Sequence, residues 1–197
     1  MDKAPHVILL AGPNGAGKST SAPALLRDTF AVDEFVNADA IAQGLSAFRP
    51  ESVALEAGRI MLKRLQELTD KRADFAFETT LASRTFAPWL KRLAATGYKS
   101  HLMFLTLPDA ETAISRVASR VRLGGHHVPA PDIRRRFEAG LRNLFNLYMP
   151  VVASWHIFDN SHPGCPIKIA EGGQETSLSV IYEKQYNTLV KGYGHGR

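Results

Sequence analysis

The sequence predicts an α/β fold, a three-layer sandwich in which helices cover both faces of a mainly parallel sheet. Short apolar runs alternate with amphipathic segments of helical length along most of the 197 residues, which is the pattern of βαβ units. The first apolar run, residues 6–11, leads directly into a glycine-rich loop and then into a helical segment. A chain of this length, with 45% hydrophobic residues, is expected to form a single domain over residues 1–197.

The expected elements follow one another in a regular order. Strands are predicted at 6–11, 34–37, 74–78, 99–107, 155–158 and 168–170. Helices are predicted at 18–28, 51–70, 84–96, 109–122, 132–148 and 176–190. Pro23 lies inside the first of these helices, so an early end or a kink is expected there. The last strand and helix, at about 165–190, complete the domain.

Residues 12–19 form a complete GxxxxGK[ST] phosphate-binding loop between the first strand and the first helix. Its glycines let backbone N–H groups point at phosphate oxygens, and Lys18 adds a positive charge at the β and γ phosphates. The Ser19 hydroxyl is the expected Mg²⁺ ligand. The residues expected to contact the nucleotide are Gly12, Pro13, Asn14, Gly15, Ala16, Gly17, Lys18, Ser19 and Thr20. The loop therefore predicts a P-loop NTPase-type sandwich that binds ATP or GTP with Mg²⁺.

Polar residues follow two further strands at their carboxyl ends. Asn37 and Asp39 come after the second strand, and Glu78 and Thr80 come at the end of the third. Ligands of open α/β sheets bind at the carboxyl ends of the strands. These segments and the phosphate-binding loop are therefore expected to meet in one cleft.

Two carboxylates in that cleft are candidates for chemistry. Asp39 could accept the proton of an acceptor hydroxyl, because phosphoryl transfer needs a group that orients the nucleophile. Asp39 could equally cap the helical run that begins at Ala40, and the two roles are compatible. Glu78 could hold Mg²⁺ through water or bind the acceptor together with Thr80. The structural alternative for Glu78 is a cap for the helix that begins near residue 84.

The segment 120–136 is predicted to be a lid. On the helix at 132–148, Arg134 falls within the apolar stripe at about 100° per residue, and Arg136 is intermediate. Arg120 borders the apolar face of the preceding helix. A buried arginine requires a partner, which a phosphate would supply, so the lid is expected to close Arg120 and Arg134 over the γ-phosphate. The alternative for each arginine is a solvated basic face.

Two adjacent histidines, His126 and His127, lie inside this lid. Adjacent side chains point in different directions and lack the spacing of metal ligands, so we do not expect zinc. His126 is a candidate for contact with the substrate, and a plain surface position is the alternative for both.

Charge and composition restrict the partners. The net charge is +5 with a pI of about 9.5, which could suggest nucleic acid. The basic residues are spread along the chain, however, so we expect phosphate-rich small molecules instead. The single cysteine, Cys165, excludes an internal disulfide and fits a reducing, cytoplasmic environment. No apolar run approaches the ~18 residues of a membrane span, and no signal peptide precedes the first strand.

Four segments, taken in order, carry a resemblance to a known family. They are Ala-Gly-Pro-Asn-Gly-Ala-Gly-Lys-Ser-Thr at 11–20, Asn-Ala-Asp at 37–39, Phe-Glu-Thr-Thr-Leu at 77–81, and Arg-Val-Arg-Leu-Gly-Gly-His-His-Val-Pro at 120–129 followed by Ile-Arg-Arg-Arg-Phe at 133–137. In this combination the chain resembles the zeta-toxin family of P-loop kinases. The resemblance implies an ATP- or GTP-dependent kinase with Mg²⁺. In characterised members the acceptor is the 3′-hydroxyl of a UDP-linked N-acetylamino sugar, and the product blocks cell-wall synthesis.

The resemblance also implies roles for residues at matching positions. Lys18 would contact the phosphates, and Asp39 would be the base. Glu78 and Thr80 would line the acceptor side of the cleft. The transferring phosphoryl group would be stabilised by Arg120 together with Arg134 or Arg136, of which the apolar stripe favours Arg134. The chain is shorter than the long toxins, and nothing in its sequence implies an antitoxin.

Two other functions remain open. The acceptor could be another small molecule, such as a sugar, a nucleoside or an antibiotic. The protein could also be a nucleotide-dependent switch or an NTPase, which usually needs an apolar strand that ends in a metal-binding Asp. The strand that ends in Glu78 matches that pattern only in part.

Overall fold

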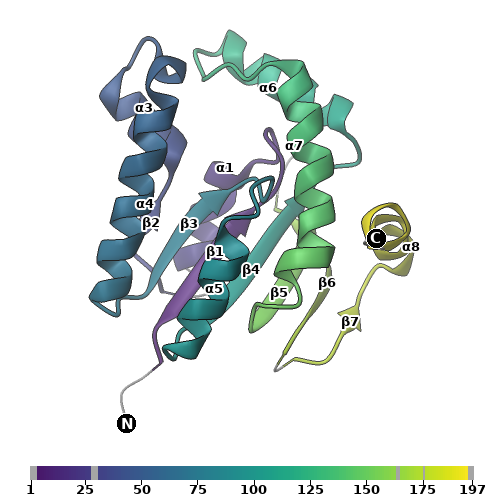
Figure 1. Cartoon of the computed structure of the whole chain (residues 1–197). Helices are drawn as coiled ribbons and strands as arrows, with labels where there is room; N and C mark the ends of the chain where they lie inside the picture. Colours follow the sequence, from purple (N-terminus) through teal and green to yellow (C-terminus); the bar gives the residue numbers. More distant parts are fainter. Residues whose placement is uncertain (1–3, 28–30, 163–164, 175, 195–197) are drawn as a thin grey trace.

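A seven-stranded sheet forms the centre of the protein, with the strand order β2-β3-β1-β4-β5-β6-β7 (Figure 1). The computed structural model describes residues 4–27, 31–162, 165–174 and 176–194. The strands are β1 (His6–Ala11), β2 (Phe35–Val36), β3 (Phe75–Thr79), β4 (Lys99–Thr106), β5 (Ser154–Asp159), β6 (Ile167–Gly173) and β7 (Ser179–Val180). The first five are parallel, and β6 and β7 add antiparallel to the β5 edge. The prediction of an α/β fold with a mainly parallel sheet is confirmed.

Helices cover both faces of this sheet. They are α1 (Lys18–Ala22), α3 (Ala38–Leu45), α4 (Ala54–Asp70), α5 (Phe86–Ala95), α6 (Ala110–Arg122), α7 (Ala130–Asn143) and α8 (Glu183–Tyr193). In Figure 1, α5 and α7 lie over one face and α1 lies behind the other, while α6 lies beyond the carboxyl ends of the parallel strands. None of the described helices is long and apolar enough to cross a membrane.

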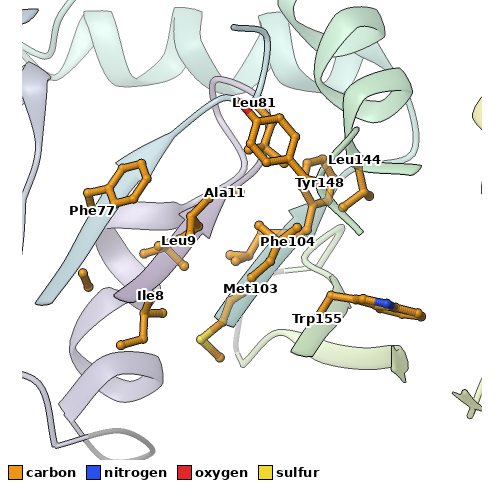
Figure 2. Close-up of a cluster of buried hydrophobic side chains, with 14 of the residues drawn as sticks. Ile8, Leu9, Ala11, Phe77, Leu81, Met103, Phe104, Leu144, Tyr148 and Trp155 are labelled. Atoms are coloured by element: carbon orange, nitrogen blue, oxygen red, sulfur yellow. The ribbon is translucent and has the colours of Figure 1, made fainter. Parts of the chain in front are cut away.

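The central strand explains why the sheet needs cover on both sides. Residues Val7 to Ala11 of β1 are fully buried, so both faces of this strand contribute to the core. Figure 2 shows Phe104 beside Tyr148 and Leu144, which follow α7, whereas Ile8 and Met103 point away from that cluster. The core therefore fixes the sheet between two helical layers and holds its carboxyl edge in place.

Tyr148 ties the end of the α7 segment to the loop after β3. Its side chain is fully buried, and its hydroxyl donates to the Ser83 carbonyl oxygen at 2.6 Å. Burial raises the pKa of Tyr148 to about 12, so the phenol stays protonated and remains a donor.

Replacement of this phenol tests the tie. We expect Tyr148→Phe to lower the free energy of unfolding by about 1 kcal/mol, because one hydrogen bond is lost without a change of shape. Urea titration followed by far-UV circular dichroism measures the difference. An unchanged midpoint would show that the Ser83 contact adds nothing to stability.

Several element boundaries differ from the predictions. The helix predicted at 18–28 ends as an α-helix at Ala22, and a π-helical segment, Pro23–Arg27, follows at the expected proline kink; residue 28 lies outside the described residues. The helix predicted at 132–148 likewise changes to a π-helical segment at Leu144–Tyr148. A 3₁₀ turn, Pro50–Val53, precedes α4.

The predicted helix at 176–190 is wrong at its beginning. Ser179 and Val180 form β7 instead, because they pair with Glu171 and Ala170 of β6. The helix starts only at Glu183. Pairing to the β6 edge therefore decides the conformation of this segment, which local sequence periodicity could not reveal.

Candidate active site

The loop between β1 and α1 has the backbone of a phosphate-binding loop. Gly15 and Gly17 adopt φ values of 78° and 79°, a region that favours glycine. A Cβ at Gly17 would also lie 2.7 Å from Nδ2 of Asn160. Both the positive φ and the nearby Asn160 amide therefore favour glycine at this position.

Asn160, directly after β5, holds this loop in place through a side-chain hydrogen bond. Its Nδ2 donates to the Ala16 carbonyl oxygen at 2.7 Å, and the residue is 8% exposed. The Arg116 guanidinium of α6 donates in turn to the carbonyl oxygens of Asn160 and Ser161, at 2.8 and 2.7 Å. Sequence reasoning missed both Asn160 and Arg116. The signal for Asn160 was present, since it is a polar residue at the carboxyl end of a predicted strand, as Asn37 and Glu78 are.

Removal of the Asn160 amide should loosen the loop. We expect Asn160→Ala to lower the free energy of unfolding by about 1–3 kcal/mol, because the buried Ala16 carbonyl loses its donor. Nucleotide affinity should fall as well, since the loop then has to be ordered on binding. Thermal denaturation with and without ATP measures both effects. Full retention of ATP-induced stabilisation would mean that Asn160 does not shape the loop.

Lys18 is almost fully buried at the base of the loop, with 6% of its surface exposed. Its Nζ donates to the Pro13 carbonyl oxygen at 3.0 Å and lies 3.5 Å from Oε1 of Glu78. Burial lowers the pKa of Lys18, and the neighbouring carboxylates of Glu78 and Asp39 oppose that shift. A cation held by its own loop in this way is placed to meet an anionic ligand.

Glu78 joins the loop because β3 lies directly beside β1, where Glu78 is opposite Leu10. Its Oε2 accepts a hydrogen bond from Ser19 Oγ at 2.7 Å and another from Asn37 Nδ2 at 2.8 Å. The alternative that Glu78 caps the following helix is wrong, since α5 has no side-chain cap and starts at Phe86.

Asn37, and not Asp39, caps α3. The Asn37 side-chain oxygen accepts from the backbone N–H groups of Asp39 and Ala40, at 2.8 and 3.3 Å. The capping alternative for Asp39 is therefore wrong. Asp39 lies in the first turn of the helix, where its side chain is exposed and close enough to act on the Lys18 pKa. Its carboxylate is thus available to a ligand in the cleft.

The lid segment meets the region around α3 through His126. Arg120 donates to the His126 carbonyl oxygen at 2.9 Å. The His126 ring lines a cavity of about 40 Å³ together with Asp39 and Pro50. His126 also lines a second cavity of about 390 Å³. The wall of this cavity comes from residues 43–51, including Phe48, and from residues 124–129. His126, whose side chain is 24% exposed, thus lies between the segment 120–136 and the α3 region.

Two buried polar side-chain atoms among the described residues lack a hydrogen-bond partner, and both belong to this region. They are Oδ1 of Asn14 in the loop and Nδ1 of His126 in the lid. The nearest carboxylate oxygen to His126 Nδ1, on Glu51, is 4.0 Å away, beyond hydrogen-bond range. Buried polar groups without partners are rare in native proteins, where a protein group, an ordered water or an ion usually satisfies them.

Arg134 departs from its predicted place. Its side chain is 52% exposed, and its Nε and Nη2 donate to the Glu111 carboxylate of α6 at 2.9 and 3.1 Å. The expectation of a buried-side Arg134 is therefore wrong. Arg136 is half-buried and precedes Gly140 by one helical turn, so both lie on the same face of α7. A Cβ at Gly140 would lie 2.5 Å from the Thr80 carbonyl oxygen, so this face of α7 packs on the loop after β3.

The structure thus brings together most of the predicted site. Lys18, Ser19 and Glu78 are in direct contact, Asn37 connects them to Asp39, and the positive charge of Arg120 is close enough to lower the Lys18 pKa. The exception is Arg134, which pairs with Glu111, and Thr20 lies exposed in the first turn of α1. Thr80 lies under α7, and its hydroxyl oxygen accepts from the Ala82 N–H at 3.4 Å.

The cluster contains oxygen atoms suited to Mg²⁺. Ser19 Oγ and the Glu78 carboxylate are in contact at the mouth of the loop. Mg²⁺ is usually bound by one or two protein oxygens together with water and substrate phosphates. No group of three or more His, Cys, Asp or Glu side chains among the described residues could hold a metal by itself. This pattern fits an ion that arrives with a nucleotide.

The sheet order and the phosphate-binding loop between β1 and α1 define a P-loop α/β protein of the nucleotide-binding class. Residues 1–162 match the family model of the Zeta toxin family. The chain belongs to that family.

Individual proteins are similar to this chain in sequence or in fold. An uncharacterized protein of Haemophilus influenzae is 26% identical over 132 residues, which cover 66% of this chain and 91% of that protein. The fold is similar to AvrRxo1-ORF1 in complex with AvrRxo1-ORF2, solved with sulphate ions (TM-score 0.77, 18% identity) and with ATP (TM-score 0.73, 18% identity). Those alignments cover 94% of this chain, which spans only 63% of the length of that protein. It is also similar to the PezAT toxin–antitoxin system of Streptococcus pneumoniae (TM-score 0.64, 16% identity, 97% of this chain and 86% of that one).

Proposed function

We propose that this protein transfers the γ-phosphoryl group of ATP or GTP to a hydroxyl of a small molecule, with a UDP-N-acetylamino sugar as the best acceptor. The observation that carries the proposal is the connected cluster of Lys18, Ser19, Glu78, Asn37 and Asp39 at the carboxyl ends of adjacent strands. One side of the cluster is a phosphate-binding loop, and the other is a carboxylate open to an acceptor.

The donor nucleotide would lie on the loop. Backbone N–H groups of residues 12–19 and the Lys18 ammonium would bind the β and γ phosphates. Ser19 and Glu78 are the residues that would hold Mg²⁺, which would supply positive charge against the phosphate oxygens. The lowered pKa of Lys18 reflects its burial, and a bound triphosphate would favour its charged form.

Asp39 would act as the base on the acceptor side. As the acceptor oxygen bonds to the γ-phosphorus, its proton passes to the Asp39 carboxylate, and the bond to the leaving nucleoside diphosphate breaks. The exposed position of Asp39 in the first turn of α3, close to Lys18, supports this assignment.

Lid arginines would neutralise charge on the transferring group. Arg120 is the first candidate, since its charge already acts on Lys18. Arg136 is the second, because it lies on the face of α7 that packs on the Thr80 loop. Arg134, the residue favoured by the sequence, would need to leave Glu111 before it could contribute. We therefore assign the second lid position to Arg136.

The acceptor would extend from Asp39 toward the lid. The small cavity at Asp39 and the 390 Å³ cavity share Pro50 and His126 in their walls, so the two are neighbours, and the larger one would hold the part of the acceptor that lies away from the base. Glu78 and Thr80 would line the cleft from the β3 side. Membership of the Zeta toxin family supports a nucleotide sugar. An ATP-dependent reaction and the exposed Cys165 thiol are consistent with the cytoplasm.

The direct test is a transfer assay with γ-labelled ATP, Mg²⁺ and a panel of UDP-amino sugars, free sugars and nucleosides. Label on a UDP-amino sugar supports the full proposal. Label only on another acceptor retains the kinase and rejects the nucleotide sugar. Nucleic acid and an antitoxin are not part of the proposal.

One observation favours a second function, an NTPase or nucleotide-dependent switch. Glu78 lies one residue before the end of β3, the strand next to β1, and contacts Ser19, which is where such proteins carry a carboxylate on the metal side of the nucleotide. Release of free phosphate at an unchanged rate, whatever acceptor is present, would support this alternative.

A further inference from the structure

Asn37 has a connecting position that the proposed function does not use. Its side chain makes contacts in two directions from the end of β2. Oδ1 accepts from the N–H groups of Asp39 and Ala40, while Nδ2 donates to Glu78 Oε2 at 2.8 Å and lies 3.5 Å from Ser19 Oγ. One amide thus contacts the base segment, the β3 carboxylate and the phosphate-binding loop.

The orientation of this amide is fixed by its neighbours. Two backbone N–H groups require an acceptor, so the oxygen faces α3. The Glu78 carboxylate requires a donor, so the nitrogen faces β3. Rotation of the amide by 180° would place the oxygen against the carboxylate and the NH₂ against N–H donors. Asparagine satisfies both sides at once, whereas the other common N-cap residues, Ser, Thr and Asp, have no NH₂ group.

Glu78 depends on Asn37 in a way that differs from its contact with Ser19. Both residues donate to the same oxygen, Oε2. Ser19 belongs to the nucleotide-binding loop, and its hydroxyl is the expected metal ligand. Asn37 lies outside that loop. It is therefore the donor that can hold Glu78 with or without a nucleotide.

We propose that Asn37 is a positioning residue for phosphoryl transfer, which fixes Asp39 and Glu78 relative to each other through one side-chain amide. The proposal rests on the function proposed above, in which Asp39 meets the acceptor and Glu78 the metal side of the donor. The contacts of Asn37 described above are all with protein groups. Its effect is to keep Asp39, on the acceptor side, at a fixed position relative to Glu78, on the donor side.

Substitution of Asn37 by serine separates this effect from helix capping. Serine is also a good N-cap residue, so Asn37→Ser keeps an oxygen for the α3 N–H groups and removes only the donor to Glu78. We expect this variant to lose about 10–100-fold in kcat and to need about 10–100-fold more Mg²⁺ for half-maximal rate, the range found when groups that orient metal ligands are removed. Asn37→Ala should show the same kinetic losses together with a lower melting temperature. Asn146→Ser is the matched control, because its amide contacts Arg142 and Tyr193 outside the cleft; it should leave kcat and the Mg²⁺ requirement unchanged.

Two readouts keep the proposal open to refutation. Wild-type kcat and wild-type Mg²⁺ requirement in Asn37→Ser would reduce Asn37 to a helix cap and overturn the proposal. Should Asn37→Ser fail to fold, Asn37→Thr replaces it, since threonine also caps α3, lacks the NH₂ donor and adds no charge beside Glu78.

The Mg²⁺ dependence of binding of a fluorescent ATP analogue provides a readout that needs no acceptor. If the wild type binds the analogue but transfers phosphate to nothing, the proposed function fails. A raised Mg²⁺ requirement for binding in Asn37→Ser would then still support the link to Glu78, and an unchanged one would reject it.

Discussion

Asp39→Asn is expected to lower kcat for phosphoryl transfer by about 10²–10⁴-fold, the usual contribution of a general base. The substitution keeps the shape of the side chain and removes the group that would accept the proton. Asp39 is exposed and contacts the nucleotide loop only through its charge, so nucleotide binding should change little. Initial rates with the labelled acceptor, together with titration of a fluorescent ATP analogue, measure the two effects separately.

The control for Asp39 is a carboxylate outside the cleft. Asp70 ends α4, where it accepts a hydrogen bond from Gln66. Asp70→Asn should transfer phosphate at the wild-type rate. If Asp39→Asn does so too, Asp39 is not the base. If both kcat and nucleotide affinity collapse in Asp39→Asn, the residue supports the loop rather than the acceptor.

The sequence could predict that Asp39 and Glu78 lie near the phosphate-binding loop because parallel strands end at one edge of the sheet. The loop after β1, Asn37 after β2 and Glu78 in β3 are far apart in the chain, yet β3 lies between β1 and β2. Polar residues at those ends therefore meet, whatever the helices between them do. The same reasoning applied to β5 would have identified Asn160.

Where two residues close together in the sequence could both cap a helix, the sequence alone could not predict which of them does so. Asn and Asp are about equally good N-cap residues, so the segment Asn37 to Asp39 was compatible with either cap. The extended backbone of Asn37, with φ −133° and ψ 118°, decides the question in its favour. Only the structure reveals this conformation and the second set of contacts that Asn37 makes with Glu78.

The same limit applies to Arg134. Helical phase indicates which side of α7 faces the core. It does not indicate which side chains of neighbouring helices lie next to the residues at the border of that side. Glu111 on α6 is close to that edge and takes both donors of the guanidinium. Gly140, which the sequence analysis did not use, identifies the cleft side of α7 because it packs on Thr80. That contact is the reason for preferring Arg136.

Arg120→Ala is expected to cause the largest loss of transfer among the lid variants, about 10³–10⁵-fold in kcat, the effect of removing an arginine that stabilises a transferring phosphoryl group. Arg136→Ala should reduce kcat as well. Arg134→Ala should mainly break an exposed pair with Glu111, which contributes only about 0–1 kcal/mol to stability. Single-turnover rates with saturating acceptor compare the three variants directly.

The order of these three effects decides the structure of the closed lid. A lid that keeps the observed Arg134–Glu111 pair predicts losses in the order Arg120, Arg136, Arg134. A lid that breaks this pair on closing predicts that Arg134→Ala is as damaging as Arg120→Ala. In that case Glu111→Gln, which frees Arg134, should accelerate transfer. If Glu111→Gln leaves the rate unchanged and Arg134→Ala has little effect, Arg134 acts as a tie between α6 and α7, and Arg120 and Arg136 remain as the arginines of the site.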